Sequence, residues 1–198
     1  KTLVGGGRVQ WDPSDKRTVG IEGAWQMGDA NMQLAGLPND KHRDAFAGQL
    51  NLEYRYLNDY DTTLKLNYTY LSGNDDISDG DFNAWDPMFE DQTPGEILNI
   101  LFANTNMMYI KASGTMMPRE DLTLGLSYTW AKLAEKSQAG NATAYSPTFG
   151  PASGNTYAIN RNQSDLGHEI DTWATWDYTE DVDFSVVGAW YIPGNYFT

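Results

Sequence analysis

Residues 166–197 read LGHEIDTWATWDYTEDVDFSVVGAWYIPGNYF, and this stretch decides the fold. Two runs alternate apolar and polar residues around a short acidic turn at Glu180 and Asp181. Alternation with a period of two is typical of a β-strand whose two faces meet different environments. The stretch therefore predicts a β-hairpin with one apolar face, directed at either a protein core or lipid. In the second run that face carries Val182, Phe184, Val186, Gly188, Trp190 and Ile192, opposite Asp183, Ser185, Val187, Ala189 and Tyr191.

The composition of the 198-residue chain favours lipid. Aromatic residues make up 13% of the chain, with 12 Tyr and 7 Trp, although the mean hydropathy is only -0.55. Outer-membrane barrels combine these properties, because their lumen and loops are polar while Trp and Tyr gather at the membrane interfaces. No stretch approaches the roughly 18 consecutive apolar residues of a helical span, which excludes a helical membrane protein. The absence of Cys excludes disulfides and thiolate metal sites.

The same alternation recurs in six further segments, at about 1–11, 17–28, 46–56, 63–70, 108–116 and 122–130, which predicts eight strands in all. Their connections alternate strictly between short turns and long loops, the long ones at about 29–42, 72–104 and 135–164. Apolar-face aromatics gather near the strand ends. Trp11, Tyr56 and Tyr178 lie by the short turns, and Trp25, Tyr68, Tyr70, Trp130 and Trp190 lie by the long loops.

Connections that alternate between short and long, together with two aromatic girdles, are typical of outer-membrane barrels, whose short turns face the periplasm. A soluble sandwich or barrel has less reason to sort its connections in this way. The sequence therefore predicts an all-β fold, a transmembrane antiparallel up-and-down β-barrel in the outer membrane of a Gram-negative bacterium. Residues 1–198 form a single barrel domain or a fragment of one. With short turns in the periplasm both chain ends would lie outside, so we expect the eight strands to belong to a larger barrel.

Several motifs in order resemble the alginate-export family of outer-membrane barrels. They are the pattern of residues 166–184, the PGNYF of 193–197, GNDD at 73–76, DGD at 79–81, DPMF at 86–89, and residues 124–128 with LAE at 133–135. The resemblance covers about residues 50–197. It implies a large monomeric barrel of about eighteen strands that passes anionic polysaccharide out of the cell, in a family whose members are also described as generic porins.

The polar faces of the strands supply the residues expected to line the pore: Arg8, Glu22, Glu53, Arg55, Lys65, Lys111, Glu169 and Asp171. An exporter of a polyanion is expected to line its lumen with Arg and Lys, because a wall of one charge concentrates the opposite ion. Here the signs are mixed. For any single residue, pairing across neighbouring strands is the simpler interpretation. The visible residues therefore do not single out alginate.

An acidic segment in the second long loop has two interpretations. Asp75, Asp76, Asp79 and Asp81 are hard oxygen ligands close in sequence, which makes them candidates for a Ca²⁺ site and Ca²⁺ the one candidate cofactor. Their spacing does not fit an EF-hand, and a solvated acidic loop is the simpler reading. Residues 94–102 are apolar for an external loop. They predict a short helix that folds into the barrel mouth or packs on neighbouring loops.

Other function classes have little support. The net charge of -14, without a basic cluster, excludes nucleic acid as a partner. The chain has two His residues, His42 in a loop and His168 on the apolar parity, and neither position supports a catalytic triad. Glu169 and Asp171 share one face, but two carboxylates on a pore wall more often set a field than catalyse a reaction. We therefore expect no enzyme activity.

Two function hypotheses remain. The first is an outer-membrane channel or porin of the alginate-export type that passes anionic polysaccharide or small hydrophilic solutes. The alternative is a structural barrel that acts as a sheath for a periplasmic or cytochrome-like partner subunit. Membrane lipid and lipopolysaccharide are the expected surroundings in both cases.

Overall fold

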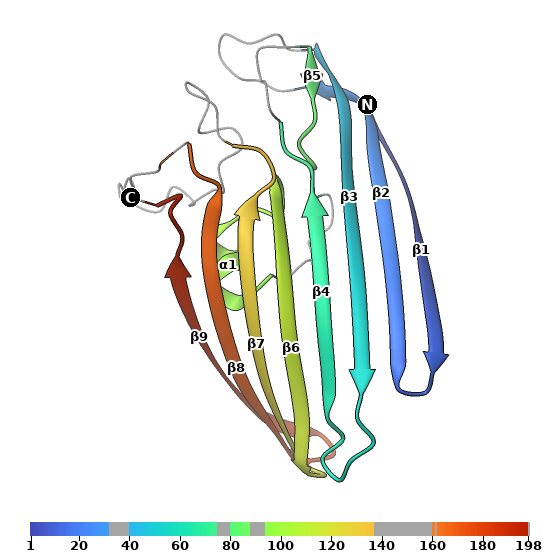
Figure 1. The fold of residues 1–198 in the computed structure, drawn as a ribbon, viewed down its shortest axis with the longest axis vertical. Helices are drawn as coiled ribbons and strands as arrows, with labels where there is room; N and C mark the ends of the chain where they lie inside the picture. The colour runs from blue at the N-terminus through green and yellow to red at the C-terminus, as the bar shows by residue number, and fades with distance from the viewer. Residues whose placement is uncertain (32–39, 75–79, 88–93, 137–159, 161, 198) are drawn as a thin grey trace.

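The computed structural model describes residues 1–31, 40–74, 80–87, 94–136, 160 and 162–197. Within them, eight long strands follow one another in a single antiparallel sheet (Figure 1). Each pairs with the next along the chain, and in this described part β1 and β9 form the two open edges. The all-β up-and-down architecture predicted from the sequence is confirmed. The strands are β1 (Thr2–Ser14), β2 (Arg17–Asn31), β3 (Asp40–Arg55), β4 (Thr63–Leu71), β6 (Met107–Arg119), β7 (Leu122–Leu133), β8 (Asp165–Thr179) and β9 (Val182–Pro193).

The period-two alternation gives the sheet two different faces. The register aligns Asn51, Asn67, Lys111, Thr129 and Glu169 in one row across five strands on the inner face. The outer face exposes large aliphatic side chains on every long strand, which a sheet in water would not tolerate and a sheet in lipid requires. These outward residues include Val9, Ile21, Leu52, Leu66, Ile110, Leu126, Ile170 and Val186.

Exposed tryptophans lie at both ends of this outer face, where the sequence predicts the two aromatic girdles. Near the short turns Trp11 and Trp176 are exposed, and near the long loops Trp25 and Trp190 are exposed. Amphipathic rings suit the membrane interface because one end is apolar and the indole N–H needs a polar partner. Three of the tryptophans donate that N–H to an aspartate: Trp25 to Asp44, Trp130 to Asp165 and Trp176 to Asp121.

The short turn between β6 and β7 holds one of these aspartates in its charged form. Arg119 donates from Nε to Asp121 Oδ1 at 2.8 Å, and Trp176 donates to Oδ2 at 3.0 Å. The hydrogen bond from Arg119 is the main reason that the pKa of Asp121 is lowered below its ordinary value. Because the pair is exposed, it orders the turn more than it stabilises the barrel.

The long connections contain more structure than the alternation alone predicts. The strands β2 and β3 continue to Asn31 and from Asp40, so both run into the segment 29–42 that the sequence assigns to a loop. The second long connection contains the two-residue strand β5 (Asp81–Phe82), which pairs in parallel with β3, and the helix α1 (Glu96–Leu101). The short helix predicted in residues 94–102 is confirmed. Among the described residues no helix is long and apolar enough to cross a membrane.

The buried residue Asn106 joins both ends of the β4–β6 connection to the start of the β7–β8 connection. Its Nδ2 donates to the Glu135 carbonyl at 3.1 Å, and its Oδ1 accepts from the Glu135 N–H at 2.8 Å. Its own N–H donates to the Ser72 carbonyl at 3.2 Å. Gly73 packs directly against this side chain, and a Cβ there would lie 1.9 Å from Asn106 Oδ1. The long-loop end of the sheet is therefore fixed locally.

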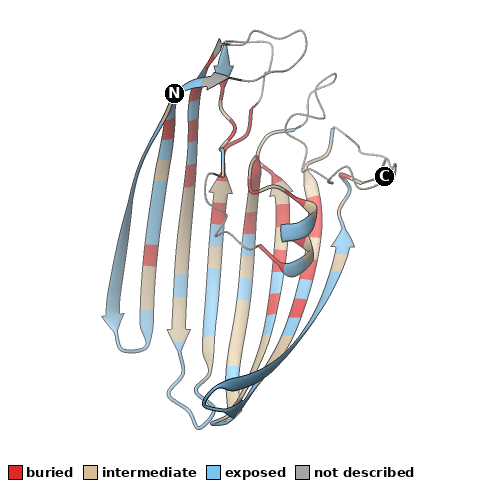
Figure 2. Cartoon of the chain, turned by 180° about the vertical axis from the view of Figure 1, so that it is seen from behind, coloured by how far each residue is buried: buried red, intermediate tan, exposed pale blue. Residues whose placement is uncertain are grey.

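The apolar core lies under α1, on the inner face of β6 to β9, rather than along the whole sheet (Figure 2). Closer to the short turns, the indole of Trp173 lies over Gly125, where a Cβ would be 2.0 Å from the ring. One half of the inner face is thus covered by apolar groups. On β1 to β4, residues 81–86 cover the long-loop end, and the middle of these strands stays open in the described part. The core consists of Leu98, Phe102, Met107, Tyr109, Ala131, Leu133, Leu166 and Tyr196.

Candidate functional site

A hollow of about 580 Å³ opens on the uncovered half of the inner face. Side chains from β1, β2, β3, β4 and β6 line it, and most are polar. They point inward because they occupy the positions that alternate with the lipid-facing ones. Neutral hydrogen-bonding groups form the floor, among them Gln10, Gln49, Asn51, Asn67 and Ser113. Asn67 Nδ2 donates to Asn51 Oδ1 at 2.7 Å, which fixes this part of the floor.

The charges that line the hollow are mostly positive. Of the eight residues predicted to line a pore, five lie here, and four of these five are basic: Arg8, Arg55, Lys65 and Lys111. The fifth, Glu53, is 3.2 Å from Arg55 Nη2 and 3.2 Å from Lys65 Nζ. One carboxylate is thus shared between two cations, and the hollow keeps a positive excess.

Glu22 occupies an inward position next to this hollow. The register places it opposite Arg8 on β1 and Gln49 on β3, and its side chain is exposed. It does not belong to the set of side chains that line the hollow. The structure therefore places six of the eight predicted residues on the β1 to β6 side of the sheet, five of them together in the hollow.

A second recess of about 380 Å³ continues the hollow towards the short turns. It lies beside the turn between β1 and β2 and is lined by Asp12, Asp15 and Lys16 among others. Thr18, Glu53 and Arg55 line both recesses, so the two join along the wall. Gln10 Nε2 donates to Asp12 Oδ2 at 3.2 Å, which extends the polar surface down β1. A polar path therefore runs along the inner wall from the middle of the sheet to its short-turn end.

The remaining two predicted residues, Glu169 and Asp171, lie under α1. Their side chains are buried, with exposures of 0% and 3%. The Glu169 carboxylate accepts from the N–H groups of Ile97 at 2.7 Å and Leu98 at 2.6 Å. Asp171 Oδ2 accepts from Ser127 Oγ at 3.0 Å. Both carboxyl groups are buried on β8, and neither belongs to the side chains that line the hollow.

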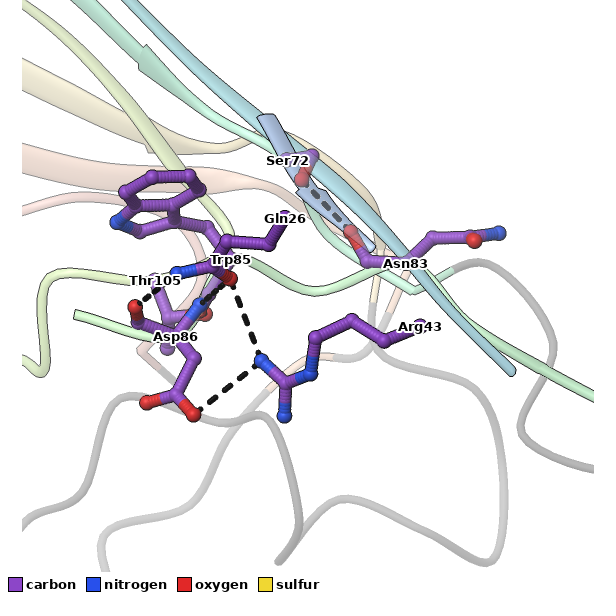
Figure 3. A network of polar contacts seen from close by, with 7 residues as sticks. All are labelled: Gln26, Arg43, Ser72, Asn83, Trp85, Asp86 and Thr105. Atoms are coloured by element: carbon purple, nitrogen blue, oxygen red, sulfur yellow. Dashed lines mark hydrogen bonds and ion pairs between the residues drawn. The ribbon is translucent and has the colours of Figure 1, made fainter. Parts of the chain in front are cut away.

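A polar network that sequence reasoning missed joins β2 and β3 to residues 83–86 at the long-loop end of the sheet (Figure 3). Gln26 holds the backbone of Asp86 by two hydrogen bonds, of 2.6 and 3.0 Å. The buried Arg43 reaches Gln26 Oε1 at 3.3 Å and Asp86 Oδ2 at 3.2 Å, and its guanidinium covers the ring of Phe82. Continuing the alternation of β3 back from Phe46 would have placed Arg43 on the inner face. Its partners come from a loop, which alternation does not describe.

The predicted calcium site falls largely outside the described residues. Asp75, Asp76 and Asp79 lie there, and Asp81 belongs to β5. Among the residues that are described, no group of three or more acidic, His or Cys side chains is arranged to hold a metal ion. The calcium site stays a prediction.

Together, the lipid-facing apolar surface, the two girdles and the polar inner hollow define the wall of an outer-membrane β-barrel of the transport type. The model of one family, described as alginate export, matches residues 1–198. The chain therefore belongs to the alginate export family, a family of outer-membrane β-barrels with an export or porin-type function rather than an enzymatic one. Comparison with curated proteins gives no match.

Proposed function

We infer that this chain forms the wall of an outer-membrane channel that passes anionic polysaccharide or small anionic solutes through its lumen. The observation that carries this proposal is the separation of charge on the inner face. Four basic side chains gather in the open hollow, whereas Glu169 and Asp171 are buried beneath α1. Within the hollow, four basic side chains outnumber the one carboxylate of Glu53, which supports a lumen wall that attracts anions.

A basic surface of this kind attracts anions without binding them tightly. Arg55 and Lys65 already share the carboxylate of Glu53, so a passing carboxylate exchanges with a resident one rather than meeting two uncompensated cations. Conduction requires that binding favours entry but still allows exit. The amide and hydroxyl groups between the charges, such as Asn51, Asn67 and Ser113, can hydrogen-bond the hydroxyl groups of a sugar.

The helix α1 narrows the lumen over the other half of the inner face, at β7 to β9. A helix with its side chains is about 10 Å across, so α1 fills that depth in front of β7 to β9. Glu96, Asn99 and Ile100 face away from the wall, and Ile100 is 81% exposed. A solute would therefore pass between this face of α1 and the basic hollow.

Single-channel recording in planar bilayers tests the proposal. The purified protein, without any partner, should give discrete ion currents once folding is verified by its heat-modifiable mobility in gel electrophoresis. Oligomers of an anionic sugar should interrupt these currents more often than neutral oligomers of equal length. A folded, partner-free barrel without current would refute the channel and favour the sheath hypothesis. Equal interruption by both oligomers would refute the preference for anions.

A further inference from the structure

The helix α1 cannot hold its own position. It has six residues, and an isolated helix shorter than about 12 residues is marginal in water. Its N-cap residue is Gly95, which has no side chain with which to cap the helix. What holds α1 must therefore come from the barrel wall.

Glu169 supplies the missing cap from strand β8. Its two carboxylate oxygens accept from the N–H groups of Ile97 and Leu98 at 2.7 and 2.6 Å, so both oxygens are engaged in one contact. On the neighbouring strand, Thr129 Oγ1 donates to the Pro94 carbonyl at 2.6 Å. The contact needs glycine at position 95, because a Cβ there would lie 2.5 Å from the Glu169 carboxyl carbon. Side chain and helix are thus fitted closely to each other.

Asp171 adds a second buried carboxyl group beside this one. It lies two positions after Glu169 on the same face of β8, so the two side chains start about 7 Å apart, and both are buried. Ser127 donates to its Oδ2, but its buried Oδ1 has no hydrogen-bond partner among the described groups. Two carboxylates are both acceptors, so contact between them becomes a hydrogen bond only when one carries a proton. A proton on Asp171 Oδ1 would convert that unsatisfied oxygen into a donor to Glu169.

Among the described residues, no cation is paired with the carboxyl group of either Glu169 or Asp171. Lys111 lies in the same row as Glu169 but on β6, two strands away, so the backbones of the two residues are about 10 Å apart. In the part of the chain that the structure describes, the other titratable groups around the pair are Glu96 on α1, Asp165 on β8 and the tyrosines of the core, Tyr109, Tyr191 and Tyr196, which are acidic or neutral.

We propose that Glu169 is the positioning residue of the constriction, and that a proton shared with Asp171 keeps α1 docked against the wall. When that proton leaves to lumen water, two negative charges share one buried site, and α1 detaches from the wall. The channel is then constricted at low pH and wider at high pH. This inference rests on the proposed channel function, since it describes how the width of that channel is set.

A spin label on α1 tests the docking without reference to current. The sequence contains no Cys, so Ile100→Cys gives a single labelling site on the exposed face of the helix. In the otherwise unchanged protein, label mobility should increase as the pH is raised from about 5 to about 9. Asp171→Asn should abolish the increase, because the amide donates to Glu169 at every pH. Glu169→Gln should give a mobile label throughout, because one acceptor oxygen is lost.

Conductance measured over the same pH range completes the test. The wild-type conductance should rise with label mobility, stay low in Asp171→Asn and stay high in Glu169→Gln. Asp177→Asn is the matched control, because Asp177 lies on the inner parity of β8 near the short turn and away from α1. It should keep the wild-type response. An unchanged pH response of the label in Asp171→Asn, or a wild-type label in Glu169→Gln, overturns the inference. A protein without current but with the predicted label response refutes the channel alone.

Discussion

The two halves of the inner face follow the same alternation but serve different purposes. On the β1 to β6 half, inward side chains such as Arg8, Lys65 and Lys111 line an open polar hollow. On the β7 to β9 half, Glu169 and Asp171 occupy equivalent inward positions but are buried beneath α1 and its apolar core. An inward polar position therefore faces the lumen or supports a loop, depending on what the loop places over it.

The largest effect should come from loosening the covered half. Leu98 is fully buried under α1, and truncating such a residue costs about 2–5 kcal/mol. Leu98→Ala should therefore detach α1, so that hydrogen exchange of residues 96–101 accelerates about 30-fold or more, since 1.4 kcal/mol is a factor of ten.

Ile100→Ala is the matched control for this change. Ile100 lies on the same helix but is 81% exposed, so its truncation should alter stability by no more than about 0.5 kcal/mol. Similar exchange rates in the two variants would mean that the core under α1 does not hold the helix.

A smaller effect should come from the open half. Glu53 offsets Arg55 and Lys65 at 3.2 Å from each, so Glu53→Gln leaves two cations without their carboxylate. The reversal potential in a salt gradient should move in the anion-selective direction, and the shift should shrink as salt screens the charges. Asp177→Asn removes an inward carboxylate near the short turns without such a pair. A shift as large as that of Glu53→Gln would show that net charge matters more than position in the hollow.

The sequence predicted the sheet because alternation is a local property. Leu50 and Tyr68 fall on the lipid parity and Asn51 and Asn67 on the inner one, and the register pairs them across β3 and β4 as expected. The short helix was predicted too, from its apolar residues. Its docking was not, because Gly95 and Glu169 are 74 positions apart and nothing local links them.

Contacts between distant residues also explain the other features that the sequence did not predict. The strands β2 and β3 extend beyond their expected ends because their backbone pairing continues through residues such as Asp29 and His42. The polar side chains of these residues favoured a loop in the sequence analysis. The network of Arg43 with Gln26 and Asp86 depends on a returning loop. Alternation predicts which face a residue occupies, but not which loop covers that face.

The reversal potential of a charge-reversed channel tests the central claim most directly. Lys65→Glu with Lys111→Glu replaces two of the four cations of the hollow, while Lys132→Glu reverses a lysine on the outward parity of β7. In a salt gradient, the double variant should shift strongly towards cations relative to the unmodified protein, and Lys132→Glu should not shift. An unchanged reversal potential in the double variant would contradict the account, because the basic hollow would then not line the path of the ions.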